Sequence, residues 1–439
     1  MGSQGRDPAQ GGPPDRTGEV KPPPARCPPS PGLCVPAARL ALLTGGGDRP
    51  YALGLSSALA AAGVQLDFIG SDEQDGPEVR ANPRIRFLNL RGDQNVAASP
   101  WRKAWRVLAY YRRLLAYAVL ARPRIFHILW NNKFELFDRT LLMLFYKLLG
   151  KKIVFTVHNV NARARDGGDS WLNRATLRFQ YRRCDHIFVH TEKMKQELMA
   201  DFGIPASRIS IIPFGINDTV PNTALTPAEA RRRVGAGAGD KTLLFFGNIA
   251  PYKGLEYLVA AFIELHRRSL GPPSSAFRSP SSDYRLVIAG RPKECEDYWS
   301  RIQRMISTSG VGDRIIQRIE HTPDEQTELY FKAADVLVLP YTHIFQSGVL
   351  FLGYSFGVPV IAADVGSLRE EIVEGKTGFV FRPQDASDLA KAIEKYFASD
   401  LYRNLENRRA DIRIYANERH SWTKVAAITT QVYSNLLKR

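Results

Sequence analysis

Residues 241–268 read KTLLFFGNIAPYKGLEYLVAAFIELHRR. The apolar run 241–248 predicts a buried strand, and after a short turn residues 251–268 carry apolar side chains at helical spacing. A strand that passes through a glycine into a helix is the repeating unit of a doubly wound parallel sheet. The stretch therefore predicts an α/β fold for the second half of the chain.

The same pattern recurs on both sides of this stretch. Strands are predicted at 284–290, 334–341 and 358–364 and a late helix at 386–397, while residues 269–283 predict a surface insertion. In the first half, strands are predicted at 39–43, 64–70, 85–90, 124–130, 152–158, 186–191 and 209–215.

These series divide the chain into five parts. We predict a disordered arm rich in proline and glycine at 1–36, an N-terminal domain at 37–215, a linker at 216–240, a C-terminal domain at 241–420 and a closing helix at 421–439. Two such domains face each other across a cleft, and ligands bind at the carboxyl ends of their strands.

Composition narrows the class of partner. Of the 439 residues, 44% are apolar and 24% charged, as expected for two domains with cores. The 60 basic and 44 acidic residues give a net charge of +16, which favours polyanionic partners. The four cysteines have no paired spacing, which argues against a zinc site or a disulfide framework. No secretory signal and no apolar run of about 18 residues is visible, so we expect a cytoplasmic chain without a membrane-spanning helix.

Five segments of the second half occur in a characteristic order: FFGNIAPYKGLEYLVAAF, YRLVIAG, ADVLVLPY, GVPVIAADVGSLREEI and GKTGFVF. Together they resemble family-4 retaining glycosyltransferases of the GT-B fold. The closing stretch 421–439 resembles the family's last helix, which crosses back to the N-terminal domain. The resemblance implies two Rossmann-like domains and a nucleotide-sugar donor bound by the C-terminal one.

The resemblance assigns the donor diphosphate to the C-terminal domain. Lys253 matches the family's diphosphate-binding lysine, and a lysine beside free helix N–H groups can compensate the charge of a leaving diphosphate. Ser347, Gly348 and Val349 can cradle a phosphate with hydroxyl and N–H groups. The alternatives are a solvated lysine and an ordinary serine N-cap. Asn248 stands where the family usually has an arginine, so it offers a hydrogen bond without a charge.

The chain departs from the family at two acidic positions. Ile344 and Leu352 stand where the family has glutamates that lie near the sugar and hold the ribose. Gln346 is the candidate to replace the first as a neutral hydrogen-bonding group. Glu370 is the candidate for the ribose, and an exposed glutamate at a helix start is the alternative.

The N-terminal domain supplies the second group of candidates. His158 ends a predicted strand, where it can bind a sugar hydroxyl or take a proton, and it matches a functional histidine of the family. A satisfied core histidine is the alternative; His127, His190 and His321 lack comparable support. The loop Gly45–Gly47 matches the family's glycine-rich turn, although a tight strand-to-helix turn explains it equally.

Two other motifs are rejected. Pro50 stands where a dinucleotide fingerprint after Gly45 and Gly47 needs glycine, and Glu370 stands where a P-loop ending at Lys376-Thr377 needs its first glycine. The sequence has no Asp-x-Asp triplet to hold a metal on a diphosphate. We therefore expect a metal-independent reaction without a cofactor.

Residues 101–124 form a basic, aromatic stretch without acids. Such a helix can lie on an anionic membrane surface, which would make the chain peripheral on the inner face of a membrane. A helix packed on the sheet with solvated arginines is the alternative. No recognition motif accompanies the charge, so nucleic-acid binding is not predicted.

Three functions remain open. The first is a hexosyltransferase of polysaccharide biosynthesis with a lipid-linked or saccharide acceptor. The second is a nucleotide-sugar epimerase on the same architecture. The third is a non-catalytic nucleotide-sugar-binding subunit, suggested by the missing glutamates and arginine.

Overall fold

The computed structural model describes residues 39–438 apart from 96, 166–167, 217–219, 271–283, 294 and 345. The predicted arm at 1–36 lies outside the described residues, as does most of the predicted insertion at 269–283. The first two residues of that insertion are helical instead, because helix α10 continues to Leu270.

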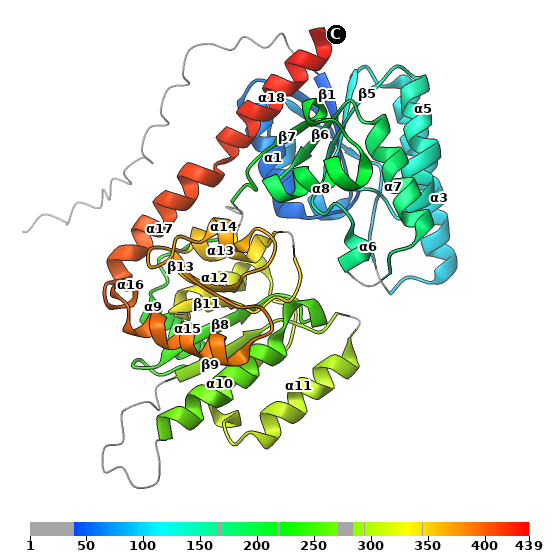
Figure 1. Ribbon diagram of the computed structural model, residues 1–439. Coiled ribbons are helices and arrows are strands. Elements are labelled where there is room, and N and C mark those ends of the chain that lie inside the picture. The colour runs from blue at the N-terminus through cyan, green and yellow to red at the C-terminus, as the bar shows by residue number, and fades with distance from the viewer. Residues whose placement is uncertain are drawn as a thin grey trace, which may run out of the picture. The chain divides into compact units, whose positions relative to one another are not determined.

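The first sheet has seven parallel strands in the order β3-β2-β1-β4-β5-β6-β7 (Figure 1). All seven fall within predicted strands: β1 Arg39–Leu43, β2 Gln65–Gly70, β3 Ile85–Asn89, β4 Ile125–Ile128, β5 Lys152–Thr156, β6 His186–Val189 and β7 Ile209–Ile211. The order reverses between β1 and β4. The loops that follow these two strands therefore leave the sheet at its switch point, where such folds bind ligands.

Alternation along β1 explains how this sheet is covered. Leu40 and Leu42 pack in a core with α1 (Arg49–Ala61), while Ala41 and Leu43 pack in the opposite core. The opposite core also holds residues of α3 (Pro100–Leu120), α5 (Met143–Leu148), α7 (Trp171–Arg183) and α8 (Glu192–Phe202). The shorter helices are α2 (Pro77–Arg80), α4 (Glu135–Phe137) and α6 (Ala162–Arg165).

The second sheet has six parallel strands in the order β10-β9-β8-β11-β12-β13. They are β8 Lys241–Phe246, β9 Tyr284–Ala289, β10 Ile315–Arg318, β11 Val336–Leu339, β12 Val360–Ala363 and β13 Gly378–Phe381. β10 and β13 are the two edge strands and were not predicted. Both are only four residues long, and β10 alternates buried and exposed side chains too briefly to stand out. The switch point lies between β8 and β11.

Helices cover both faces of the second sheet. They are α9 Pro227–Val234, α10 Leu255–Leu270, α11 Glu296–Thr308, α12 Asp324–Ala333, α13 Gly348–Ser355, α14 Leu368–Glu371, α15 Ala386–Ala398, α16 Asp400–Arg403 and α17 Leu405–His420. α9 lies within the segment predicted as a linker, yet its Ala230 and Val234 are buried in the core of this sheet. The second half of that segment is therefore packed structure.

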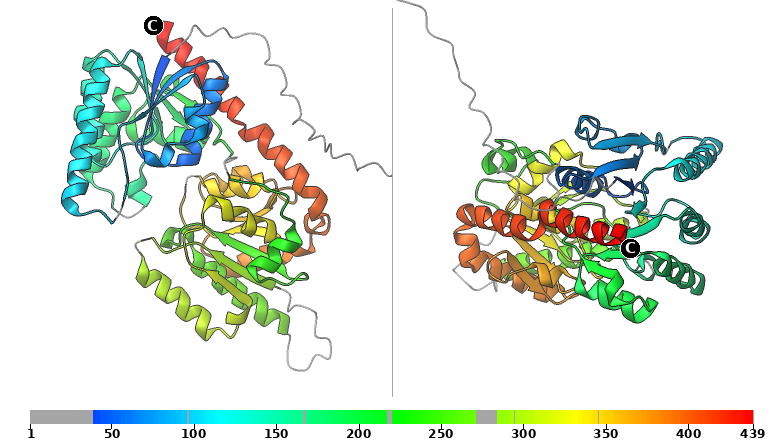
Figure 2. Two further views of the ribbon diagram at one scale, coloured as in Figure 1. Left: turned by 180° about the vertical axis from the view of Figure 1, so that it is seen from behind. Right: turned by 90° about the horizontal axis from the view of Figure 1, so that it is seen from above.

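The last helix, α18 (Trp422–Lys438), returns to the first sheet and packs against α1 (Figures 1 and 2). A Cβ on Gly54 of α1 would come 2.2 Å from the Trp422 indole, so the absence of a side chain at Gly54 lets the two helices meet closely. The Trp422 indole N–H also donates to the carbonyl of Ile216, 2.8 Å away. The closing segment is thus tied to the first sheet by packing and by a hydrogen bond.

His127 is a structural residue of this junction. Its Nδ1 lies 2.5 Å from the Tyr433 hydroxyl of α18, and its Nε2 lies 2.7 Å from the Thr156 hydroxyl. Burial lowers the pKa of His127 to about 3, which keeps the ring neutral. Both ring nitrogens are occupied, so His127 is a satisfied core histidine.

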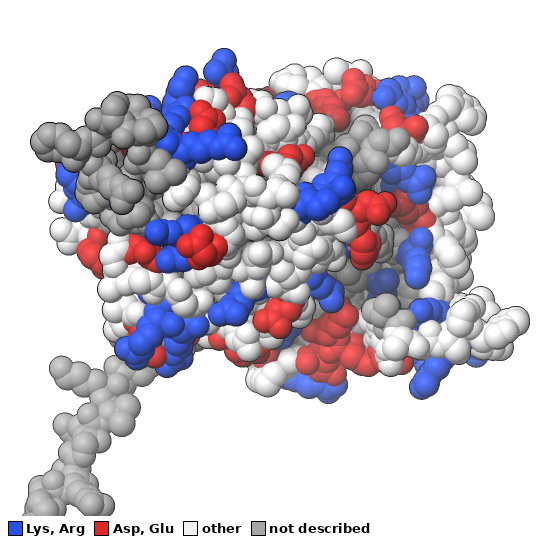
Figure 3. Space-filling view, turned by 90° about the horizontal axis from the view of Figure 1, so that it is seen from below, with Lys and Arg blue, Asp and Glu red and all other residues white. Residues whose placement is uncertain are grey.

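Several features of the described residues bear on the partners that the protein can have. No helix within residues 39–438, as far as they are described, is long and apolar enough to cross a membrane. The same residues contain no group of three or more histidine, cysteine or acidic side chains placed to hold a metal ion. Cys184 and Cys295 are free thiols. Basic and acidic side chains alternate over the face shown in Figure 3 rather than forming a field of one sign.

Candidate functional site

The loop Gly45–Gly47 follows β1 directly at the first switch point. Gly45 and Gly46 have φ angles of 59° and 75°, which residues with side chains rarely adopt. A Cβ on Gly45 would come 2.1 Å from the carbonyl oxygen of Trp130, and one on Gly47 would come 2.0 Å from its indole. The loop therefore lets the segment that follows β4 pack directly on it.

Trp130 in turn covers His158, which follows β5. The two rings are stacked with their centroids 4.3 Å apart and their planes 4° from parallel. Tyr51, in the first turn of α1, meets the same imidazole edge-on at 4.7 Å. Two aromatic rings from two other segments thus fix the orientation of the His158 ring.

A chain of hydrogen bonds sets the tautomer of His158. His190 Nδ1 lies 3.2 Å from the carbonyl oxygen of Ile212, which can only accept, so this nitrogen carries the hydrogen. Burial lowers the pKa of His190 to about 4, so its ring is neutral and its Nε2 is unprotonated. Nε2 lies 3.1 Å from His158 Nδ1 and must receive a hydrogen from it. His158 Nε2 is therefore left with a lone pair.

This Nε2 is shielded from solvent and has no hydrogen-bond partner among the described residues. Burial also lowers the pKa of His158 well below its ordinary value of 6.5. The imidazole is therefore neutral at neutral pH. Its Nε2 can accept a hydrogen bond from a hydroxyl group more readily than it can take up a proton. A buried acceptor left empty costs free energy, which a bound hydroxyl group would recover.

Lys253 lies at the second switch point, in the helical turn η4 (Pro251–Lys253) after β8. Its side chain is buried, and its Nζ lies 5.5 Å from the ring centroid of Tyr341, which follows β11. A Cβ on Gly247 would lie only 2.9 Å from this Nζ, so the absence of a side chain at Gly247 leaves room for the Lys253 ammonium. Burial lowers the pKa of Lys253, and no described residue pairs with its ammonium. An anion would compensate it.

The start of α13 borders the same space. The Val349 side chain lies 3.6 Å from the position of a Cβ on Gly247, beside Lys253. Ser347 is the N-cap residue but makes no cap hydrogen bond, and its hydroxyl lies 3.3 Å from that of Tyr341. The first N–H groups of a helix have no partner within it. Lys253, Ser347, Gly348 and Val349 border this space, which we call the anion cradle because such groups can hold an anion.

The other candidate residues of the C-terminal domain differ in how far their side chains are exposed to solvent. Both polar atoms of the Gln346 amide are shielded and without a partner among the described residues, so this amide is free to bind a ligand. Asn248 is exposed at the end of β8, and Glu370 is exposed on α14. The structure shows no contact between Glu370 and the described residues around Lys253.

The two positions without the family glutamates are apolar. Ile344 is half-buried and packs against the core, and Leu352 of α13 is buried. Leu352 lines a hollow of about 270 Å³ together with Asp48, Tyr51, Gly348 and Trp422, among others. In that hollow the Asp48 carboxylate accepts the N–H of Tyr51 as the N-cap of α1.

Sequence reasoning missed two residues of the N-terminal site, Trp130 and His190. The register of β5 and β6 pairs Val154 with His186, so four residues further on His158 stands opposite His190. The available signal is a second histidine, His190, at the end of another predicted strand. Only the strand order shows that the two strand ends are adjacent.

Two family models match the chain in tandem. The model described as "Glycosyltransferase Family 4" matches residues 45–220, and "Glycosyl transferases group 1" matches residues 240–399. The chain is a family-4 glycosyltransferase. It is 26% identical over 412 residues to a D-inositol 3-phosphate glycosyltransferase of Arthrobacter sp., covering 88% of this chain and 90% of that protein. With the enzyme of that name from Pseudarthrobacter chlorophenolicus it shares 29% over 253 residues, 58% of this chain and 56% of that protein.

Solved structures agree on the fold of this glycosyltransferase. Sucrose-phosphate synthase of Thermosynechococcus elongatus superposes with a TM-score of 0.70 at 20% identity, over 91% of this chain and 99% of that one. The Anabaena protein Alr3699/HepE, solved with UDP-glucose, superposes with a TM-score of 0.66 at 15% identity, over 91% and 99%. Both establish two Rossmann-like domains in the GT-B arrangement.

The anion cradle predicts the effect of one substitution. Lys253→Ala should weaken binding of a nucleoside-diphosphate sugar by about 1.5–3 kcal/mol, the range for a hydrogen bond to a charged group. Isothermal titration with the sugar nucleotide that best stabilises the parent protein measures this directly. Lys391→Ala, which removes an exposed lysine of α15, is the control and should bind as the parent does. Undiminished affinity in Lys253→Ala would remove this lysine from the site.

Proposed function

We propose that this glycosyltransferase moves a hexosyl group from a nucleoside-diphosphate sugar to a saccharide or lipid-linked acceptor, with retention of the anomeric configuration. The observation that carries the proposal is the buried, unpartnered ammonium of Lys253 beside the first turn of α13. The UDP-glucose complex of the Anabaena neighbour supports a sugar nucleotide as donor. Such a transfer is a step in the synthesis of a polysaccharide or a related glycoconjugate.

The cradle suits a reaction in which a diphosphate leaves. Negative charge grows on the diphosphate as the sugar bond breaks, and a fixed cation with aligned N–H groups stabilises that charge without reorganising. Lys253 supplies the cation, while Ser347, Gly348 and Val349 supply the hydroxyl and N–H groups. Because the sequence has no Asp-x-Asp triplet, we propose that these groups act without a metal ion and without a cofactor.

His158 and Gln346 are proposed to hold the transferred sugar. The lone pair of His158 Nε2 accepts a hydrogen bond from a sugar hydroxyl, and the free amide of Gln346 can donate one and accept another. A neutral, oriented acceptor positions the sugar rather than storing a proton. Retention requires the acceptor to approach from the side that the donor diphosphate occupies, and no carboxylate stands at position 344 or 352 to act as a nucleophile.

Two of the proposed contacts depend on exposed side chains. Glu370 is kept as the candidate for the donor ribose, and Asn248 as an uncharged companion of Lys253.

Neither the fold nor the similarities favour the epimerase interpretation.

The role of His158 predicts a split between catalysis and donor binding. His158→Ala should lower the transfer rate by about 10²-fold or more and weaken donor binding much less, by the roughly 1 kcal/mol of one neutral hydrogen bond, since the main loss is one of positioning at the reacting sugar. Steady-state transfer and donor titration are measured on the same preparation. His321→Ala, which removes an exposed histidine, should match the parent in both. Equal turnover of the His158 variant and the parent would leave His158 with a structural role only.

The metal-independent cradle predicts that activity survives a chelator. Transfer assayed in excess EDTA should proceed at the rate found without it, because Lys253 and the α13 N–H groups supply the positive potential. Loss of activity in EDTA that magnesium or manganese restores would contradict the proposal.

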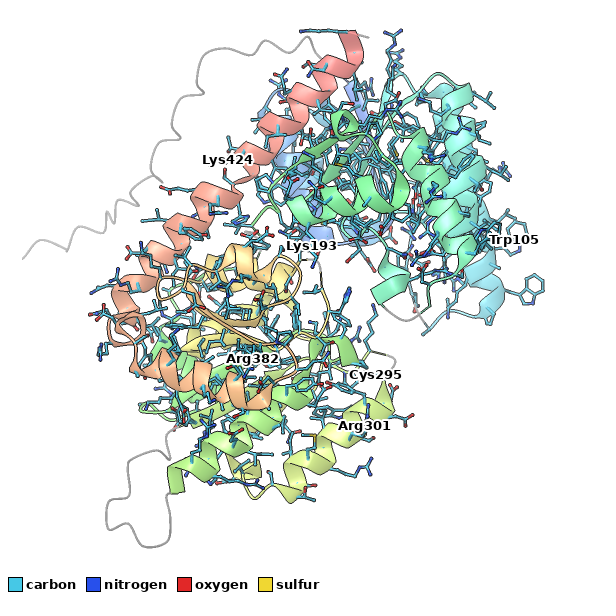
Figure 4. All side chains as sticks on the ribbon, in the orientation of Figure 1. Trp105, Lys193, Cys295, Arg301, Arg382 and Lys424 are labelled. Carbon is cyan, nitrogen blue, oxygen red and sulfur yellow. The ribbon has the colours of Figure 1, made fainter. Side chains whose placement is uncertain are left out.

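α3 supports a membrane-surface location. The helix runs from Pro100 to Leu120, shorter than the predicted 101–124 because Pro123 follows it. One face packs on the sheet through Tyr110, Tyr111, Leu114 and Ala118. On the other face Trp101, Trp105 and Leu108 are 80%, 65% and 61% exposed, so these apolar side chains are not covered by the sheet, and Figure 4 shows Trp105 projecting away from the ribbon.

Cations and an apolar groove accompany this exposed face. Arg102, Arg112 and Arg113 are exposed beside it. Trp105, Leu108, Phe134 and Phe137 line an open groove of about 1140 Å³. Aromatic and aliphatic side chains flanked by arginine suit the boundary between acyl chains and anionic headgroups. We propose that α3 places the enzyme on an anionic membrane, the inner face of a cell membrane, and brings it to a lipid-linked acceptor.

This placement predicts selective vesicle binding. The parent should co-sediment with anionic vesicles but not with neutral ones, and each of Arg102, Arg112 and Arg113 changed to Gln should cost about 1 kcal/mol of attraction. Raised salt should weaken binding, because the Debye length shortens to about 3 Å at 1 M. Arg301, Arg304 and Arg413 changed to Gln remove the same charge from α11 and α17 and are the control. No binding to anionic vesicles at low salt would refute the membrane model.

A further inference from the structure

Arg91 lies directly on the glycine loop. It follows β3, and its guanidinium takes the place that a side chain on Gly46 would occupy, since a Cβ there would come 2.0 Å from Arg91 Nη1. The backbone N–H of Arg91 is bonded to the carbonyl of Gly70 at the end of β2, which anchors the start of the side chain. The arginine is therefore held at the same loop that supports Trp130 and His158.

The Arg91 guanidinium makes no ion pair and no hydrogen bond with a described residue, although Asp138 lies near enough for the charge of Arg91 to act on that carboxyl. Nη1 is shielded from solvent and has no hydrogen-bond partner among the described residues. The contact that the structure does show for it is with the ring of Tyr110, whose centroid is 5.4 Å from Arg91 Cζ. A ring face attracts a cation but accepts none of the five N–H groups. A shielded donor without an acceptor is costly, and a ligand with acceptor oxygens would recover that cost.

A hollow of about 190 Å³ opens beside Arg91, between the glycine-loop side of the sheet and α3. Its lining includes Lys103, Arg106, Asn132 and Lys133. The space corresponds to roughly six water molecules at about 30 Å³ each, enough for a phosphoryl group with part of its hydration.

The charges around this hollow are positive and largely free. No carboxylate lines it. Asp93 nearby pairs with Arg106, and Asp138 accepts hydrogen bonds from Tyr111 and Asn132. Lys103 and Lys133 have no ion pair or hydrogen bond from their ammonium groups to any described residue. Arg91, Lys103 and Lys133 therefore line one small space without an ion pair to any described carboxylate.

We propose that this hollow binds a phosphoryl group of the acceptor, with Arg91 as its main ligand and Lys103 and Lys133 as supporting cations. A guanidinium fork matches phosphate oxygens in geometry and charge. The inference rests on the proposed function and deepens it, since it names the chemistry of the acceptor. The glycine loop joins the hollow to Trp130 and His158, so a phosphoryl group held there keeps the rest of the acceptor at the site of transfer.

Binding of inorganic phosphate tests the site without any turnover. The titration is done in the Lys253→Gln protein, so that the donor cradle does not contribute. In this background phosphate should bind, and Arg91→Gln should weaken it roughly tenfold or more. Lys103→Gln and Lys133→Gln should each weaken it less, and Arg91→Lys should retain part of it.

Arg84→Gln is the matched control for these variants. Arg84 is an exposed arginine just before β3, at the opposite end of the strand from Arg91. It should leave phosphate binding unchanged. Equal phosphate affinity with and without Arg91→Gln would overturn the proposal. If Arg91→Gln does not fold, unchanged affinity in both lysine variants overturns it equally.

Transfer assays then separate the two sources of a phosphoryl group. A soluble hexose phosphate is compared with the unphosphorylated hexose, and phosphatidylcholine vesicles with phosphatidic acid are compared with phosphatidylcholine alone. The phosphorylated member of at least one pair should be the better acceptor or competitor in the parent, and Arg91→Gln should remove that preference. Equal use of charged and uncharged members in both pairs would overturn the acceptor role. No transfer by the parent, with phosphate binding through Arg91 intact, would instead contradict the proposed function.

Discussion

The N-terminal site depends on a loop that has no room for side chains. Trp130 occupies the space beside Gly45 and Gly47, and Arg91 occupies the space beside Gly46. Because protein interiors are close-packed, a single added methyl group would displace one of these residues. Trp130 is the ring that holds His158 in place, so the loop sets the geometry of the site through Trp130.

The same principle operates at the second sheet with a different outcome. Gly247 leaves space for the Lys253 ammonium, which the protein buries without an acid. Buried cations are normally paired, because desolvation of an ion costs several kcal/mol. Lys253 breaks this rule, and the half-buried Arg91 has its Nη1 shielded without a hydrogen-bond partner among the described residues. Both lie at the carboxyl edges of the two sheets. A phosphate-bearing ligand at either cation would compensate this desolvation cost. Both positions therefore favour the binding of an anion.

The buried histidines show how neighbouring hydrogen bonds assign different roles to one residue type. His127 has a hydroxyl at each ring nitrogen and is complete within the core. His158 is supported at one nitrogen by His190 and left open at the other. Burial keeps both neutral near neutral pH, so the difference between them is one of partners rather than of charge. Ile344 and Leu352 are apolar where the family pattern has glutamates, so in the proposed function the sugar and ribose contacts fall to neutral or exposed groups.

The sequence by itself determined the class of fold, because apolar strands, glycine turns and helical periodicity are local signals. It gave all seven strands of the first sheet and four of the second, and missed β10 and β13, which are short edge strands with little apolar pattern. It also singled out Lys253, Ser347 and His158, since each follows a strand where ligands bind. Only the tertiary structure decided which strand ends are neighbours. Strand order brings His190 to His158, Trp130 onto the glycine loop and Arg91 against Gly46, and these contacts join residues that are tens of positions apart, where no local pattern can record them.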